Sequence, residues 1–182
     1  YAKAIGAEIY SKPSEVHKML KAVPIENGLF AVSPNDFTKI INQYIQDDEA
    51  LIRNMSKTTE ENKVFYTYNI DRYSKIRFIT DETQINTQAI LLESNYRSDP
   101  NNGFNAGSYF SYIMLACDKK MTSDLGKQIA YDLNMFDTTK KGTYLSVHNG
   151  VTYSCTIDRN KITVLIQPES ANQSDAVSDT IK

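Results

Sequence analysis

Apolar and polar residues alternate most regularly between residues 142 and 168, and this alternation predicts three antiparallel strands. Every second side chain of a strand lies on the same face of a sheet. The polar run from Asp158 to Lys161 separates two alternating segments and is expected to form a tight turn. The residues expected on the shared apolar face are Val151, Tyr153, Cys155, Ile157, Ile162, Val164 and Ile166. The segment therefore predicts a β-meander with one buried face.

The strand before the Asn149-Gly150 dipeptide can pair in two registers. A two-residue turn at this dipeptide would place Leu145 and Val147 on the polar face. A three-residue loop that includes His148, with a bulge at Gly150, would shift the pairing by one residue and bury both side chains. Because a shift of one residue moves every side chain to the other face, the apolar pattern favours the bulged loop. We therefore expect Leu145 and Val147 in the core.

Helical periodicity is clearest directly after residue 33. Ser33 is suited to cap a helix, Pro34 to its first position, and Asp36 to the first turn near the positive end of the helix dipole. Apolar residues then recur every three or four positions, as on one face of a helix. They are Phe37, Ile40, Ile41, Tyr44 and Ile45. This pattern predicts an amphipathic helix packed against a sheet.

The remaining periodic segments complete the expected order of elements. Four extended runs follow the first helix, at about 51–57, 63–70, 74–80 and 85–93. A helix is expected from about Ala106 to Cys117, and Thr122 or Ser123 should cap another. The order helix, four strands, two helices and three-stranded meander predicts an α+β fold with antiparallel sheet segments packed on about three helices. It also suggests a pseudo-repeat of two halves.

The chain is expected to divide into three parts. Residues 33–168 should form a single α+β domain. Residues 1–32 are expected to form a tether or a short helix, and residues 169–182 a disordered polar tail. Because the sequence starts at Tyr1, we expect a mature protein or a fragment from which a signal peptide or lipid anchor was removed.

The composition of the chain indicates which classes of partner are not expected. The chain has 182 residues, 41% of them hydrophobic, and a formal net charge of −2. Acidic and basic residues are interspersed, so nucleic acid and anionic membrane surfaces are not expected partners. No apolar run approaches the roughly 18 residues of a transmembrane helix. The twelve tyrosines and the absence of tryptophan fit a secreted or cell-envelope protein, such as a lipoprotein. An AT-rich coding genome could also explain the tyrosine excess, and a cytoplasmic location stays open.

Groups that could support catalysis or metal binding are few. The two histidines, His17 and His148, are far apart in sequence, and no metal-ligand spacing is present. Cys117 and Cys155 both fall on positions expected to face the core, where they could be buried thiols or one disulfide. We therefore predict no catalytic residues, no metal and no cofactor.

The segment from Asn95 to Gly107 is rich in Asn and Gly and is expected to be the longest ordered loop. Loops on a rigid scaffold are frequent recognition sites, and tyrosine is favoured at protein interfaces. The candidate binding residues in and beside this loop are Tyr96, Arg97, Phe104 and Tyr109. In the alternative interpretation, Phe104 and Tyr109 only seal the edge of the domain.

These observations favour a non-enzymatic, extracytoplasmic binding or assembly domain, namely the soluble part of an anchored cell-envelope protein, with a protein as its partner. The alternative is a cytosolic chaperone-like or immunity-type protein that masks a partner. A third hypothesis is an enzyme with an unrecognised site. The sequence does not indicate an oligomeric state.

Overall fold

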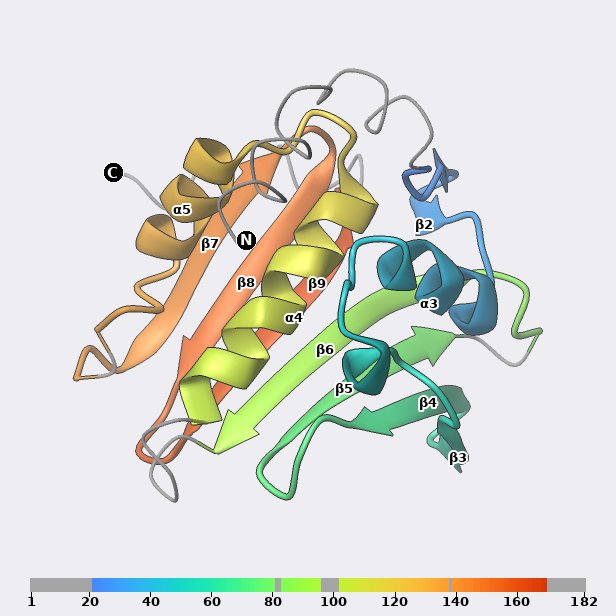
Figure 1. The fold of residues 1–182 in the computed structure, drawn as a ribbon, viewed down its shortest axis with the longest axis horizontal. Helices are drawn as coiled ribbons and strands as arrows, with labels where there is room; N and C mark the ends of the chain where they lie inside the picture. The colour runs from blue at the N-terminus through green and yellow to red at the C-terminus, as the bar shows by residue number, and fades with distance from the viewer. Residues whose placement is uncertain (1–20, 81–82, 96–101, 138, 170–182) are drawn as a thin grey trace, which may run out of the picture.

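One antiparallel sheet contains all the strands that the structure describes, and three α-helices cover one of its faces (Figure 1). The structure is a computed structural model that describes residues 21–80, 83–95, 102–137 and 139–169. The other face of the sheet has no helix of the described chain packed on it; we call it the open face. This two-layer arrangement confirms the predicted α+β class with an antiparallel sheet.

The sheet has nine strands, of which seven follow one path in the order β3-β4-β5-β6-β9-β8-β7. β1 and β2 form a short hairpin beside them, and β2 also pairs with β6. The strands are β1 Ile25–Glu26, β2 Leu29–Phe30, β3 Ser56–Glu60, β4 Lys63–Asn69, β5 Ser74–Thr80, β6 Thr87–Asn95, β7 Gly142–His148, β8 Val151–Ile157 and β9 Lys161–Pro168. The first predicted extended run, 51–57, is thus largely irregular: it follows a 3₁₀ turn at Asp48–Ala50, and only Ser56 and Lys57 belong to β3.

The sheet consists of two meanders, β3 to β6 and β7 to β9, whose last strands pair with each other at its centre. β6 and β9 are antiparallel, with Ile90 opposite Ile166 and Leu92 opposite Val164. A helix precedes each meander in the chain. The two halves are therefore similar in element order, and a relation between their sequences stays a prediction.

The first α-helix, α3 (Pro34–Asn42), begins where the sequence predicts it. The Ser33 hydroxyl oxygen accepts a hydrogen bond of 3.2 Å from the Asp36 backbone N–H, and Pro34 occupies the first turn. Phe37 and Ile41 are fully buried against the sheet. The cap and the stripe up to Ile41 are confirmed, but the helix ends at Asn42, so Tyr44 and Ile45 pack against the core from beyond its end.

Helix α4 (Asn102–Cys117) lies across the middle of the sheet, and α5 (Ser123–Asp132) lies over β7 (Figure 1). Thr122 caps α5 by accepting a hydrogen bond of 3.1 Å from the Leu125 N–H. Helix α4 starts four residues before the predicted Ala106, so the end of the predicted loop to Gly107 is helical. Ala106 is packed in the core and stabilises the start of the helix. Its tertiary contacts outweigh the weak helix propensity of the Asn and Gly residues that precede it.

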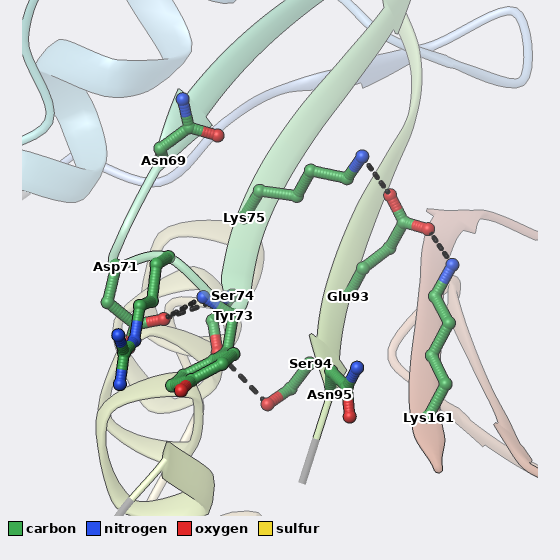
Figure 2. Close-up of a pocket in the computed structure, with 10 residues that line it drawn as sticks. Asn69, Asp71, Tyr73, Ser74, Lys75, Glu93, Ser94, Asn95 and Lys161 are labelled. Carbon is green, nitrogen blue, oxygen red and sulfur yellow. Dashed lines mark hydrogen bonds and ion pairs between the residues drawn. The ribbon is translucent and has the colours of Figure 1, made fainter. Parts of the chain in front are cut away.

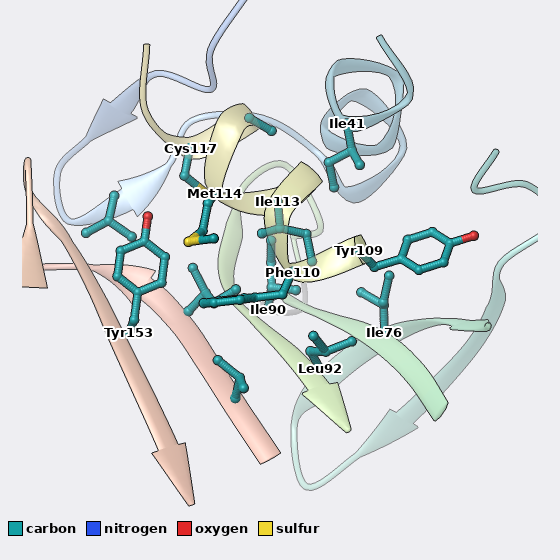
Figure 3. Packing of buried hydrophobic residues seen from close by; sticks show 14 of the residues in the cluster. Ile41, Ile76, Ile90, Leu92, Tyr109, Phe110, Ile113, Met114, Cys117 and Tyr153 are labelled. Atoms are coloured by element: carbon teal, nitrogen blue, oxygen red, sulfur yellow. The ribbon is translucent and has the colours of Figure 1, made fainter. Parts of the chain in front are cut away.

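The core lies between the helices and the sheet. Four side chains of α4 predicted to be buried, Phe110, Ile113, Met114 and Cys117, are in it. Figure 3 shows them packed against apolar side chains of β5, β6 and β8. The rings of Phe110 and Tyr153 meet edge to face, with their centroids 6.0 Å apart. Val164, on β9, is also buried, as the meander pattern predicts.

The predicted bulged loop before β8 is wrong. His148 pairs with Val151 and Val147 with Thr152, so Asn149 and Gly150 alone form the turn. Both have positive φ angles, 50° and 78°, as a type I′ turn requires. The twist of this turn matches that of the strands it joins, so local turn chemistry sets the register.

Leu145 and Val147 consequently lie on the open face, and their predicted burial is wrong. Leu145 is 49% exposed and Val147 is 41% exposed. The opposite face of β7 holds Ser146, which is buried beneath α5 and donates a 3.2 Å hydrogen bond to the Asp132 carboxylate. Because β7 is an edge strand, its two apolar side chains are not needed to close the core.

Part of the N-terminal segment belongs to the packed structure. Val23 and Phe30 are buried in the main core, and the Phe30 ring meets the Phe37 ring edge to face at 5.1 Å between centroids. The core thus includes residues before Ser33. Most of the helix predicted near Val16 lies outside the described residues, as does the predicted tail from residue 170 onward.

Candidate functional site

A polar pocket of about 410 Å³ lies where the turn between β4 and β5 meets the end of β6 and the start of β9 (Figure 2). Its walls include side chains from both faces of the sheet, because successive residues of a strand point to opposite faces. Ser74 and Ser94 belong to the helix-covered face, and Lys75 and Glu93 belong to the open face. The pocket therefore surrounds the end of the sheet.

The β4–β5 turn is fixed by one carboxylate. An oxygen of Asp71 accepts hydrogen bonds of 2.7 Å from the backbone N–H groups of both Tyr73 and Ser74. The buried hydroxyl groups of Ser74 and Ser94 are 3.0 Å apart and join β5 to β6 by a hydrogen bond. These contacts hold one side of the pocket rigid.

Glu93 forms the charged centre of the pocket. Its side chain is only 12% exposed and lies between two ammonium groups, those of Lys161 and Lys75. Lys161 donates a hydrogen bond to Oε1, and the Lys75 nitrogen is 3.5 Å from Oε2. Burial acts to raise the pKa of the Glu93 carboxyl, but the two lysines outweigh burial and lower that pKa below its ordinary value. Glu93 is therefore ionised at neutral pH.

The two lysines have capacity to bind a further group. Each ammonium has three N–H donors, and a contact with one carboxylate oxygen does not use all three. The side chain of Lys75 is 43% exposed and that of Lys161 is 51% exposed. Arg72 also lines the pocket, with its guanidinium 4.6 Å from the centre of the Tyr73 ring. Three cationic and two carboxylate side chains give the pocket a positive balance within an acidic chain.

Glu93 Oε2 distinguishes this cluster from an ordinary surface ion pair. The atom is buried and accepts no hydrogen bond within the described part of the chain. Buried polar atoms in folded proteins usually have a hydrogen-bond partner. The carboxylate therefore has an unused acceptor position beside a cationic group, as in a site that also contacts water or a ligand.

The predicted binding loop starts at this pocket. Asn95, which lines the pocket, directly precedes Tyr96 and Arg97. Those two residues lie outside the described residues, as does the side chain of Phe104, whose backbone belongs to α4.

Tyr109, the fourth predicted binding residue, is buried. Its hydroxyl donates a 2.6 Å hydrogen bond to the Ala50 carbonyl oxygen and lies 3.5 Å from the Tyr68 hydroxyl. Burial and the neighbouring Tyr68 raise the Tyr109 pKa far above its ordinary value. This is the environment of a residue that seals the domain edge.

Both cysteines are free and buried. Burial raises the pKa of Cys117 far above its ordinary value and that of Cys155 to about 11. A thiol must lose its proton to act as a nucleophile, so both are poor nucleophiles at neutral pH. No group of three or more His, Cys, Asp or Glu side chains suited to a metal ion occurs in the described ranges. The helices described are all too short or too polar to span a membrane.

Sequence reasoning did not find Lys75, Glu93 and Lys161 as a group. Strand alternation identifies the open face of each strand separately. The contact between Glu93 and Lys161 depends on the pairing of β6 with β9, which are separated by two helices and two strands. No local signal in the sequence specifies that pairing.

Comparisons with protein-family models, with curated proteins and with solved structures found no match. The functional argument therefore depends on the geometry of the chain itself.

Proposed function

We propose that this chain is a non-enzymatic binding or assembly domain located outside the cytoplasm, and that its partner is a protein. We place the contact at the polar pocket, where Lys75 and Lys161 would bind an acidic group of that partner. The main support is the pair of half-exposed ammonium groups that buried Glu93 holds at one wall of the pocket. Charge-assisted hydrogen bonds of this kind are about twice as strong as neutral ones.

The position of the pocket also supports a contact with a macromolecule. The pocket is open to solvent and mainly polar, and the chain leaves it directly at Asn95 into the segment with Tyr96 and Arg97. Small-molecule sites are usually enclosed and mostly apolar. A partner's acidic side chain could enter the pocket while the adjacent surface contacts the rest of that partner.

A titration with a minimal probe tests the pocket. The ¹⁵N-labelled full chain is titrated with N-acetylglutamate α-amide, whose side-chain carboxylate is its one charge, and the uncharged N-acetylglutamine α-amide is the matched probe. We expect the acid alone to shift the amide resonances of Lys75, Glu93, Ser94 and Lys161, with affinity in the millimolar range typical of one small charged group, about 4 kcal/mol. Equal shifts with the two probes, or no shifts near the pocket, would contradict the proposal.

Two single substitutions locate the effect. Lys75→Met and Lys161→Met should each weaken binding of N-acetylglutamate α-amide, because each removes one cation while the other still pairs with Glu93. Lys127→Met removes an exposed lysine from α5 and should leave binding unchanged.

Fractionation of cells that produce the whole gene product tests the location separately, since recovery in the cytoplasm would favour a cytosolic partner-masking protein.

A further inference from the structure

The two edges of the sheet differ in how they are protected against pairing with another strand. Edge strands usually carry charges, prolines or bulges that prevent such pairing. β3 has five residues and includes Lys57 and Glu60. β7 has seven residues, Gly-Thr-Tyr-Leu-Ser-Val-His, with no charged residue and no proline. Its register with β8 is unbroken from Gly142 to His148, so it has no bulge either.

The register also shows which backbone groups of β7 point outward. In a two-residue hairpin the residues that flank the turn, His148 and Val151, form a hydrogen-bonded pair. Such pairs alternate along an antiparallel ladder. The N–H and C=O groups of Thr143, Leu145 and Val147 are therefore directed away from β8. No backbone hydrogen bond from the described residues reaches them.

We propose that β7 pairs antiparallel with β7 of a second copy of this chain, about a two-fold axis at Leu145. This register places Leu145 opposite Leu145 of the other copy and Val147 opposite Thr143. All three residues with outward backbone groups then form hydrogen-bonded pairs, with about six hydrogen bonds, two for each pair. The two sheets become one continuous sheet.

The side chains of β7 favour a second copy over a charged or unrelated strand. A two-fold axis places each residue of β7 opposite its counterpart or a near neighbour in the other copy. Like charges in the strand would therefore face each other and repel. β7 carries no charged residue, so this repulsion does not arise. Leu145 and Val147 are the exposed large apolar residues of the strand. Pairing about Leu145 joins both copies of these side chains into one apolar strip on the open face. An isologous contact of this kind is the commonest form of protein dimer.

The inference is independent of the pocket, because β7 lies at the edge of the sheet and the pocket lies at the ends of its central strands. Sedimentation of the full chain over a concentration series up to about 1 mM, the weak end of specific affinity, should show a reversible dimer. Leu145→Lys should raise the dimer dissociation constant about tenfold or more, because two like charges then face each other. Thr58→Lys, at the centre of β3 on the same face, is the matched control and should not change it.

Two further results identify the two-fold register. Leu145→Lys and Leu145→Glu should each be largely monomeric, and an equal mixture should dimerise again because opposite charges then meet. Leu145→Cys should form a disulfide-linked dimer on mild oxidation, since hydrogen-bonded pairs have Cα atoms about 5.5 Å apart, within disulfide range. Thr58→Cys should not. The proposal would be overturned by any of three results. The wild type could be monomeric at every concentration, the dimer could be insensitive to Leu145→Lys, or the mixture of Leu145→Lys and Leu145→Glu could fail to dimerise.

Discussion

The Tyr109 hydroxyl donates a 2.6 Å hydrogen bond to the carbonyl oxygen of Ala50, which connects the central helix α4 to the 3₁₀ turn between α3 and β3. We expect Tyr109→Phe to lower the free energy of unfolding by about 1–2 kcal/mol, because the carbonyl loses its partner in a half-buried position. Chemical denaturation measures this. Tyr112→Phe, one turn away in α4, is the control, since its hydroxyl forms no hydrogen bond within the described residues. An equal loss in both variants would mean that the bond to Ala50 contributes little.

The Asn149-Gly150 turn gives a second prediction. Gly150 has a φ of 78°, and a Cβ atom there would meet no other atom within 4 Å. Gly150→Ala should therefore lower the free energy of unfolding by about 1–2 kcal/mol through backbone strain alone. Gly107 is the matched control: it lies within α4 and also has open space around it. Gly107→Ala should raise the free energy of unfolding by about 0.5–1 kcal/mol, because alanine favours the helix. A neutral Gly150→Ala would contradict the assigned turn.

Val164 tests the core of the meander. It is almost fully buried and lies between Leu92 and Cys155 on the neighbouring strands. Val164→Ala should lower the free energy of unfolding by about 1–3 kcal/mol, through lost burial and the cavity left behind. Leu145→Ala removes more atoms from the same sheet, but from the exposed side of β7. At concentrations where the chain is monomeric it should cost less than about 0.5 kcal/mol. The reverse order would contradict the register of β7.

The charge of Glu93 predicts a dependence of stability on pH. Its pKa in the folded chain lies below the ordinary value of 4.5, so the ionised form stabilises the fold above that pH, and the contribution is lost as the pH falls through the folded pKa. We expect Glu93→Gln to be less stable than the wild type at about pH 7, by about 1–2 kcal/mol. This difference should shrink below pH 4.5.

Glu60 provides the control for this pH series. It pairs with Arg77 at 2.9 Å on the same face of the sheet, but its side chain is largely exposed. Exposed ion pairs contribute little, so Glu60→Gln should change the pH profile only slightly. A Glu93→Gln variant whose difference from the wild type is the same at all pH values would show that the Glu93 charge does not stabilise the fold.

The buried thiols give a measure of unfolding. With a pKa of about 11 for Cys155, only about one thiol in a thousand is ionised at pH 8, and burial limits access further. Ellman's reagent should therefore label the native chain slowly and the chain in denaturant at once. Val164→Ala should speed native labelling if the reaction requires global opening. Rapid labelling of the stable wild type would show that the fold opens locally around a cysteine.

Local patterns in the sequence predicted the separate elements well. Ser33 and Thr122 cap helices because their hydroxyl oxygens satisfy free backbone N–H groups at the helix ends, and this is a local property. Strand alternation predicted the core-facing residues of β8 and β9 for the same reason, although Ile162 is only partly buried. The short β1–β2 hairpin was missed, because two-residue strands are too short to show a period.

The errors and omissions have two physical causes. At Leu145 the apolar pattern favours burial, but the Asn-Gly turn sets the register, and an edge strand has less need to bury its side chains. At the pocket, Lys75, Glu93 and Lys161 come together through pairing of β6 with β9, which depends on the packing of the whole sheet. The local sequence pattern therefore does not predict the pocket. It identifies one of the lining residues, Asn95, as the start of the predicted loop.

The pairing at the centre of the sheet has a consequence for synthesis on the ribosome. Ile90 of β6 meets Ile166 of β9, 76 residues later in the chain. The first meander emerges early, and β6 from Ile90 to Asn95 then has no neighbour on its inner side until β9, the last of the described strands, has been made. Long-range contacts of this kind form slowly, and an unpaired central strand exposed for that time is prone to aggregation. A nascent chain that stalls before residue 161 would present β6 as an open edge, and such chains are expected to need a chaperone.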